Sequence, residues 1–307
     1  MIPFSLSTRP NGNGRSGVMD DRKLLVEIKR ELGAENCLDD CAVLPHSPYP
    51  LVISTDMLHE STDFPLGMTD YQIGWMAMAV TISDIAAMGA EPRYLTMAVG
   101  LDEPSRLTGI VQGANACVRS FHAAYIGGDI DSHTELTIVT TGIGYAKYPP
   151  VTRGGCRPGD LIGVTGILGR AQAGLDGYTR YWDSLIMPQP RVREGILLAG
   201  EGATAMMDIS DGLILSLYDI LDASGYGSSV SSGKLPVVRD IPENTREQYA
   251  LYGGGDFELL FTIPQNHPLP DTFSYTIIGE VINEPLILVD GMVAQKKGYL
   301  HVWEKKD

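Results

Sequence analysis

The chain alternates between stretches whose apolar residues recur every three to four positions and shorter stretches that are apolar throughout or β-rich. The helical spacing predicts helices over residues 20–32, 70–88, 105–123, 169–175, 191–200 and 213–224. The shorter runs predict strands over residues 41–44, 51–54, 95–101, 124–126, 136–145, 160–165, 206–209, 257–263 and 275–281. Because helices and strands alternate in both halves of the chain, we expect an α/β fold.

A proline pair interrupts this alternation near the middle of the chain. Pro149-Pro150 ends any regular element, and the pattern starts afresh beyond it. A chain of 307 residues is long enough for about two domains. We therefore expect a flexible polar tail over residues 1–17, a first α/β domain over 18–147 and a second over 148–307.

The net charge of the chain argues against some classes of binding partner. The chain has 38 acidic and 23 basic residues and a net charge of −15, which argues against binding to nucleic acid or to a membrane surface. No apolar run approaches the about 20 residues needed to span a bilayer, and the polar N-terminus lacks the apolar core of a secretory signal. The four cysteines show no paired metal or disulfide spacing. We expect a cytoplasmic protein with reduced thiols.

Two common phosphate-binding sequences give no support for a nucleotide site. The pattern GxxxxGK[ST] of a phosphate-binding loop is absent. The pattern GxGxxG occurs once, over residues 12–17, where it follows no strand and lies in the polar tail. If this acidic chain binds a nucleotide, metal ions have to bridge the phosphates and the protein.

Short acidic motifs near the ends of predicted elements could hold such ions. They are Asp39-Asp40, Ser54-Thr55-Asp56, Ser83-Asp84, Gly127-Gly128-Asp129 and Asp208-Ile209-Ser210-Asp211-Gly212. Magnesium prefers carboxylate oxygens and usually meets a protein through one or two carboxylates together with substrate phosphates. Several acids that converge on one cleft would suit two or more magnesium ions.

Three of the motifs also have a structural explanation. Asp39-Asp40 could form a solvated turn, Gly127-Gly128-Asp129 an ordinary turn, and Asp211 could cap the helix that follows it. Asp84 is different, because it lies inside a predicted helix between two isoleucines. A buried aspartate is costly without a partner, and a metal ion would supply one.

Six segments resemble, in order, the motifs of the thiamine-monophosphate kinase family. They are STDMLHESTDF (54–64), TISDIAAMGAEPRYLTMAVGL (81–101), YIGGD (125–129), RGGCRPGDLIGVTGILGRAQAGL (153–175), MDISDGL (207–213) and GGGDFELLFT (253–262). The resemblance extends from Asp39 to the region of Trp303. It implies the two-domain fold of the aminoimidazole ribonucleotide synthetase-like superfamily, with an N-terminal α/β domain that pairs with a second copy to form a homodimer.

The resemblance also implies ATP, thiamine monophosphate and Mg²⁺ as ligands, with direct in-line transfer of the γ-phosphoryl group. The implied metal ligands are Asp40, Ser54, Thr55, Asp56, Asp84, Asp129, Asp208 and Asp211. Among these, the acids with a catalytic role are Asp84, Asp129 and Asp211. The implied nucleotide contacts are Gly128, Asp129, Arg153 and Ser210, and the positions facing the acceptor are Asp63, Gly255 and Tyr299.

Two acceptor positions depart from the family pattern. Asp63 stands where the family usually has a histidine, and Gly255 replaces the glutamate of GGEDYEL. Tyr299 is expected to pack on the substrate ring, but it has an equal alternative as an ordinary core tyrosine. Two other functions therefore stay open. One is a superfamily relative that acts on another acceptor, such as an ATP-dependent cyclising synthetase, and the other is a non-catalytic nucleotide-binding protein.

Overall fold

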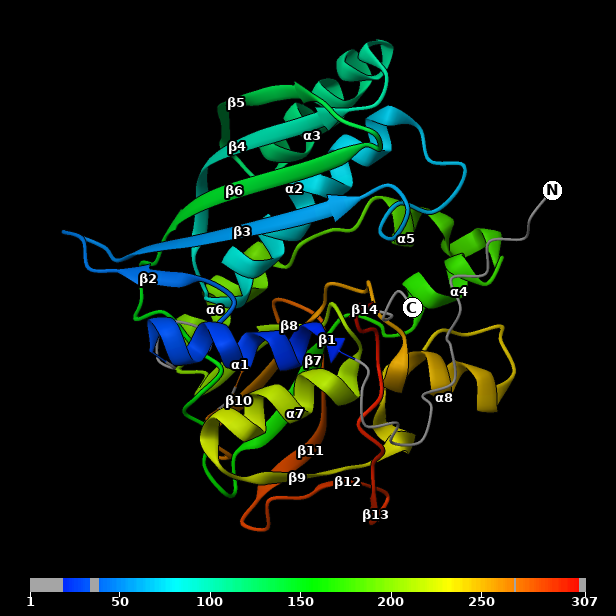
Figure 1. The fold of residues 1–307 in the computed structure, drawn as a ribbon. Helices are drawn as coiled ribbons and strands as arrows, with labels where there is room; N and C mark the ends of the chain where they lie inside the picture. Colours follow the sequence, from blue (N-terminus) through cyan, green and yellow to red (C-terminus); the bar gives the residue numbers. More distant parts are fainter. Residues whose placement is uncertain (1–18, 34–38, 268, 304–307) are drawn as a thin grey trace.

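The structure, a computed structural model, describes residues 19–33, 39–267 and 269–303, so the tail expected over 1–17 lies outside the described residues. Two sheets with their own helices form the two halves of the molecule, and a short strand pair joins the ends of the chain (Figure 1). No helix in the described ranges is both long enough and apolar enough to cross a bilayer.

The first half contains a five-stranded sheet that is covered by helices on one face. Its strands, in spatial order, are β2 (Ala42–Leu44), β3 (Leu51–His59), β6 (Thr137–Tyr145), β4 (Glu91–Leu101) and β5 (Ala124–Ser132). Helices α2 (Asp70–Ala87) and α3 (Leu107–Ser120, after the 3-10 turn Pro104–Arg106) lie behind it (Figure 1). We call the other side the open face; Met57 and Tyr94 lie on it and are exposed.

Strand β5 is longer than the sequence indicated. The motif Gly127-Gly128-Asp129 lies inside β5, paired with β4, so the alternative of an ordinary turn is wrong. A Cβ atom at position 128 would lie 1.7 Å from the Met97 carbonyl oxygen, so this position requires glycine.

Helix α2 is the central helix of the molecule. A capping box fixes its start, because Thr69 N donates to Gln72 Oε1 at 2.8 Å and Gln72 N donates back to Thr69 Oγ1 at 3.4 Å. The sequence predicted one apolar face, but α2 is buried on nearly all sides, since it packs on the first sheet, on α3, and also on α6 and β8 of the second half. Trp75 Nε1 donates to the Pro188 carbonyl at 3.0 Å and links the halves further.

The second half contains a seven-stranded, largely antiparallel sheet. Its strands, in spatial order, are β13 (Met292–Val293), β12 (Ile287–Val289), β9 (Gly227–Val230), β11 (Tyr275–Ile282), β7 (Leu161–Thr165), β10 (Leu259–Ile263) and β8 (Ala205–Asp208). Its helices are α4 (Arg170–Leu175), α5 (Trp182–Ile186), α6 (Val192–Gly200), α7 (Leu213–Ser224) and α8 (Glu243–Tyr252), with 3-10 turns at Thr179–Tyr181 and Ser232–Lys234. The largest buried cluster lies between this sheet and α7 and α8.

The first and last described residues of the chain meet on the second half. Strand β1 (Met19–Asp20) pairs antiparallel with β14 (Val302–Trp303) and leads directly into α1 (Asp21–Leu32). We call β1, the start of α1 and the segment 298–303 the terminal strap. Arg22 of the strap contacts Asp219 on α7 through an ion pair.

Candidate active site

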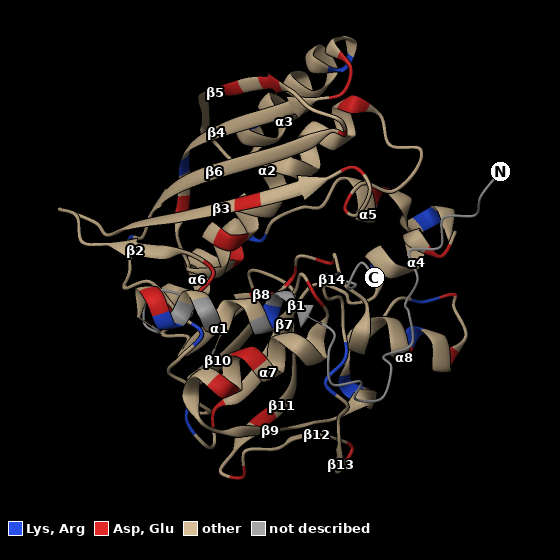
Figure 2. Cartoon of the chain, viewed as in Figure 1, with Lys and Arg blue, Asp and Glu red and all other residues tan. Residues whose placement is uncertain are grey.

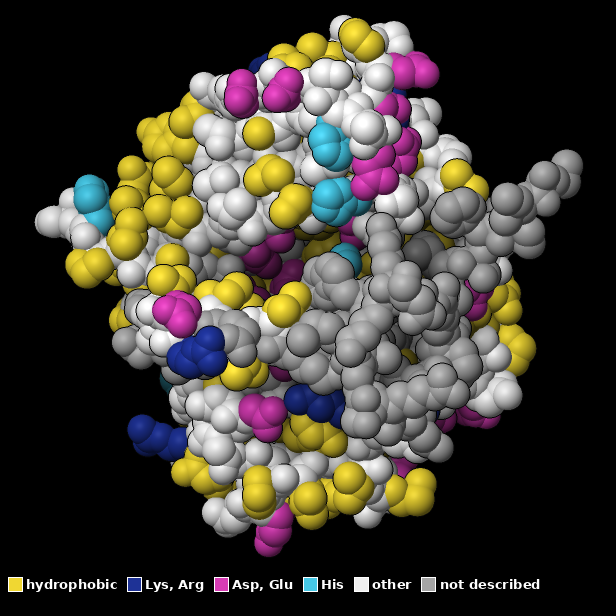
Figure 3. All heavy atoms as spheres, viewed as in Figure 1, with side chains coloured by type: hydrophobic (Ala, Val, Ile, Leu, Met, Phe, Trp, Pro, Cys, Tyr) yellow, Lys and Arg dark blue, Asp and Glu magenta, His cyan; other side chains and the backbone are white. Residues whose placement is uncertain are grey.

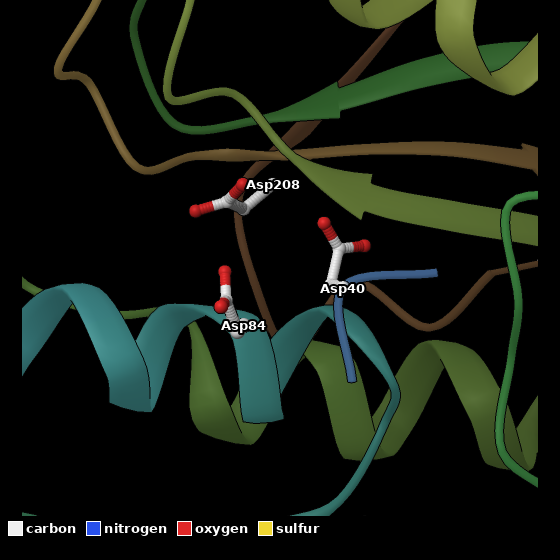
Figure 4. Close-up of side chains that lie close together, drawn as sticks. All are labelled: Asp40, Asp84 and Asp208. Carbon is white, nitrogen blue, oxygen red and sulfur yellow. The ribbon is translucent and has the colours of Figure 1, made fainter. Parts of the chain in front are cut away.

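Three carboxylates from distant parts of the sequence converge between the two halves. Asp40 precedes β2, Asp84 lies on α2 and Asp208 ends β8. One oxygen atom of each lies within 4.8 Å of the others, and the three side chains point toward a common centre (Figure 4). The space-filling view shows acidic side chains in a hollow between the halves (Figure 3). We call these three residues the carboxylate cluster.

Hydroxyl groups hold the acids of the site in place. Ser54 Oγ on β3 donates to Asp84, and Ser83 Oγ donates to Asp208 Oδ2 at 2.6 Å. Three residues before Asp84 on α2, Thr81 Oγ1 donates to Asp56 Oδ2 at 2.6 Å. Asp56 therefore lies beside the carboxylate cluster, on the face of β3 that packs against α2.

Burial and mutual repulsion make full ionisation of these acids unfavourable. Burial, reinforced by the charges of Asp56 and Asp208, raises the pKa of Asp84 well above its usual range. Burial and the nearby charge of Asp40 raise the pKa of Asp208 to about 8. Burial also raises the pKa of Asp56. A bound cation would remove this penalty, because it stabilises the ionised carboxylates.

The donor set fits a divalent cation that prefers oxygen. The side chain of Asp40 is only 2% exposed, and its Oδ2 atom is buried without a hydrogen-bond partner among the described residues. A buried carboxylate oxygen without a partner is rare in proteins, so it indicates a missing ligand. This burial also excludes the solvated turn that was the alternative for Asp40. Carboxylates on rigid elements, with hydroxyl groups beside them, are ligands that suit Mg²⁺.

We expect Mg²⁺ to bind more tightly as the pH rises from 6 to 8. The folded-state pKa of Asp208, about 8, lies above the ordinary value of 3.8, so the cation has to displace a proton. One displaced proton corresponds to about a tenfold gain in affinity per pH unit. The raised pKa also means that the metal-free fold loses stability as the pH rises through 8, so the increase in unfolding temperature on adding Mg²⁺ should grow. Thermal unfolding with and without Mg²⁺ at several pH values measures this increase. An increase that does not depend on pH would contradict the assignment of Asp208 as a metal ligand.

Arg153 lies on the second-half side of the carboxylate cluster. Its guanidinium group is ion-paired with Asp40, and its backbone N donates to Asp39 Oδ1 at 2.7 Å. Its Nη1 atom lies 4.0 Å from Asp219 Oδ2, and its Nε atom is buried without a hydrogen-bond partner in the described part of the chain. The predicted nucleotide contact Arg153 and the predicted metal ligand Asp40 are therefore neighbours.

Ser210 and Asp211 follow β8 and meet two of the predicted acceptor positions through the backbone. Gly255 N donates to the Ser210 carbonyl at 2.7 Å, and Tyr299 N donates to the Asp211 carbonyl at 3.0 Å. The Asp211 carboxylate pairs with Arg22. Helix α7 begins at Leu213, and its N-cap residue is Gly212, with no side-chain cap, so the capping alternative for Asp211 is wrong.

The two positions that depart from the family pattern have local roles. Gly255 has φ of +85°, a conformation that strains any other residue, and it offers no side chain to an acceptor. Asp63 accepts hydrogen bonds from His59 N and Thr62 Oγ1, both at 2.7 Å, and so closes the turn after β3. Tyr299 is half-buried, and its ring meets the His301 ring edge-on at 5.0 Å.

Asp129 and Thr55 are not brought together with each other within this chain. Asp129 is exposed on the edge strand β5, while Thr55 lies on β3 and bonds Thr141 at 3.0 Å. Strands β6 and β4 lie between them, and a separation of three strands corresponds to roughly 14 Å. Figure 2 shows acidic positions on β5 at the far edge of the sheet from the hollow.

Comparisons with known proteins show which proteins this chain is similar to. Residues 38–146 match the family described as AIR synthase related protein, N-terminal domain. The thiamine-monophosphate kinase of Methanospirillum hungatei is 54% identical over 93% of this chain and 100% of that protein. That of Halobacterium salinarum is 42% identical over 74% and 79%. A structure of AaThiL complexed with AMPPCP and TMP matches with a TM-score of 0.87 at 27% identity, over 92% of this chain and 97% of that chain.

The fold and the acidic site define a member of the AIR synthase related class of proteins. Sequence identity to curated relatives identifies one family within this class. The chain belongs to the thiamine-monophosphate kinase family. The resemblance drawn from the six motifs and the expected α/β, AIR synthase-like fold are thereby confirmed.

Proposed function

We propose that this chain transfers the γ-phosphoryl group of ATP to the phosphate of thiamine monophosphate and releases thiamine diphosphate and ADP. The observation that carries the proposal is the convergence of Asp40, Asp84 and Asp208 within 4.8 Å, next to Arg153. It occurs in a chain that is 54% identical to a thiamine-monophosphate kinase and shares its fold with AaThiL complexed with AMPPCP and TMP. Membership in this family gives the enzyme class, a phosphotransferase with a phosphate group as acceptor.

The site residues would act by neutralising charge and aligning the reactants. Mg²⁺ held by the acids of the cluster, together with Asp56 and Asp211, would neutralise the negative charge that accumulates between donor and acceptor. Hydroxyl groups of α2 and β3 fix the rotamers of these acids. Arg153 can pair with phosphate oxygens, and Ser210, which follows β8, would also contact the nucleotide.

The transfer itself requires no side chain that removes a proton. A phosphate oxygen of the acceptor is already ionised near neutral pH, and it forms a bond to the γ-phosphorus. The bond from that phosphorus to the bridging oxygen breaks at the same time, and the electron pair leaves with ADP. Tyr299, on the segment that crosses Asp211, would pack on the cationic ring of the acceptor.

Turnover of thiamine monophosphate tests the proposal directly. Incubation of the chain with Mg-ATP and thiamine monophosphate should yield thiamine diphosphate and ADP in equal amounts, as followed by ³¹P spectroscopy. Omission of Mg²⁺ should reduce the rate by roughly a thousandfold or more. Binding of ATP without turnover of thiamine monophosphate would contradict the proposal and would favour a superfamily relative that acts on another acceptor.

The position of Asp129 supports a homodimer that forms through the open face of the first sheet. In register across this face lie Met57, Val139, Ala98 and Asp129, one on each strand from β3 to β5. Met57 is 59% exposed, and no element of the described chain covers this row. An exposed apolar sheet face is typical of an interface between subunits.

Within one chain, Asp129 is too far from Thr55 and the carboxylate cluster to share their metal ions. If two first sheets stack face to face about a two-fold axis that runs along the strands, β5 of one subunit lies over the β3 side of the other. We therefore extend the proposal: Asp129 and Gly128 serve the site of the partner copy, where they meet the nucleotide phosphates that Thr55, Asp56 and Arg153 reach from their own chain.

A further inference from the structure

Two guanidinium groups share one carboxylate beside the proposed nucleotide site. Arg22 Nη1 on the terminal strap donates to Asp219 on α7, and Arg153 Nη1 lies 4.0 Å from the same carboxylate. Arg22 Nη2 also donates to Asp211 Oδ2 at 3.0 Å, while Arg153 is ion-paired with Asp40. The side chains thus form a continuous series of ion pairs, in the order Asp211, Arg22, Asp219, Arg153 and Asp40.

The carboxylates at the two ends of this series of ion pairs have a second proposed role. Asp40 and Asp211 are the ones that the proposed function assigns to metal ions, whereas Asp219 is assigned to none. Arg153 donates to Oδ1 of Asp40, so the Oδ2 atom, which has no partner among the described residues, is left for a cation. A carboxylate that coordinates a divalent cation shares its negative charge with that cation, so it attracts a guanidinium group less strongly. Metal loading would therefore weaken the pairing of Arg153 with Asp40 and of Arg22 with Asp211, while Asp219 still pairs with both arginines.

The N–H groups of the two arginines suit a particular class of ligand. A guanidinium group is planar and always charged, and it binds pairs of phosphate oxygens through parallel hydrogen bonds. The side chains of Arg22 and Arg153 are 23% and 25% exposed, so each keeps a surface that a ligand can reach. Asp219 is only 15% exposed and is well placed to fix both arginines.

The terminal strap determines where Arg22 lies. β1 pairs with β14, and the segment leading into β14 is fixed to the site by the hydrogen bond from Tyr299 N to the Asp211 carbonyl. Arg22 follows β1 directly and so reaches Asp211 and Asp219, which lie about 190 positions further along the chain.

We propose that Arg22 and Arg153 form a paired-guanidinium site for the polyphosphate chain of the nucleoside triphosphate, with Asp219 as the positioning residue. The inference rests on the proposed function, which supplies the role of Arg153 and the metal at Asp40 and Asp211. It adds two residues, Arg22 and Asp219, and gives the terminal strap a role in binding the nucleotide.

Nucleotide binding to four variants of the full chain tests the pair. Dissociation constants for ATP and for adenosine are measured in the presence of Mg²⁺ by competition with a fluorescent ATP analogue. Arg22→Gln and Asp219→Asn should each weaken ATP binding by about tenfold or more and leave adenosine binding unchanged. Arg22→Lys keeps the positive charge but loses the planar guanidinium group. Its affinity for ATP should therefore lie between that of the wild type and that of Arg22→Gln. Arg30→Gln, on the same helix at a side chain that is 68% exposed, is the matched control and should bind like the wild type.

The comparison of ATP with adenosine separates phosphate binding from a structural role. Equal weakening of both ligands in Arg22→Gln, accompanied by a lower unfolding temperature, would show that Arg22 only stabilises the strap and would overturn the proposal. Unchanged ATP affinity in Arg22→Gln would overturn it as well. A wild-type chain that binds no ATP would instead refute the proposed function, and the arginine pair with it.

Discussion

The Asp84→Asn variant is expected to lose phosphoryl transfer by roughly a thousandfold or more while it remains folded. Asparagine has the shape of aspartate, and its carbonyl oxygen can still accept the hydrogen bond that Ser54 donates. It cannot supply the negative charge that holds a divalent cation opposite Asp40 and Asp208. The loss should therefore appear in the rate of transfer and in the affinity for Mg²⁺, and not in the content of secondary structure.

Thermal unfolding gives an independent signature of the same variant. Because burial and neighbouring charges raise the pKa of Asp84, its ionised form destabilises the metal-free fold. Asp84→Asn should therefore unfold at a higher temperature than the wild type without metal, and it should gain less from added Mg²⁺. Asp222→Asn, at an exposed position on α7, is the control and should match the wild type in both rate and unfolding temperature. A near-wild-type rate for Asp84→Asn would refute the metal assignment.

Mixing two inactive variants should restore about a quarter of the wild-type activity. If Asp129 serves the partner's site, a mixed dimer of Asp84→Asn and Asp129→Asn contains one site with both changes and one site with neither. Random exchange makes about half of the dimers mixed, and each mixed dimer has one intact site of two, which gives about one quarter. Each variant alone should retain less than about one hundredth of the activity.

The control for this experiment is a pair of changes within one cluster. Asp84 and Asp208 contribute to the same site from the same chain, so mixing Asp84→Asn with Asp208→Asn should restore nothing. Sedimentation of the mixtures checks that dimers have formed. If the first mixture stayed at the summed activity of its two components although dimers had exchanged, the assignment of Asp129 to the partner's site would be wrong.

Much of the fold could be predicted because its helices and strands have clear sequence patterns. The strongest example is α2, whose start and end were placed to within a residue. Helix α8 was missed because its sequence, ENTREQYALY, is polar and buries only two residues, Ala250 and Leu251. Strand β5 was cut short at Ile126 because the glycines after it favour a turn in isolation, and only the pairing with β4 overrides that preference.

The sequence likewise indicates some residues of the candidate site and gives no signal for others. Asp84 stood out in the sequence because a carboxylate between isoleucines in an apolar helix requires a partner. The approach of Asp208 to Asp84 depends on β8 packing against α2, and no local pattern in the sequence encodes that contact. Arg22 and Asp219 gave no signal, since a charged residue at the start of a helix or on a helix surface is ordinary. Their roles follow from long-range contacts alone.

The pairing of β1 with β14 constrains when the enzyme can mature during translation. Met19 is among the first described residues to leave the ribosome, and its partner Trp303 is among the last. Roughly 160 residues separate the end of β6 from β14, and at about 5–20 residues per second they take about 8–30 s to synthesise, so the first sheet and α2 have that long to fold before the strap can close. A nascent or C-terminally truncated chain would then carry a formed carboxylate cluster while Arg22 still lacked its place beside Asp211. Such a chain would bind the triphosphate about tenfold more weakly, and full affinity would be acquired only at the end of synthesis.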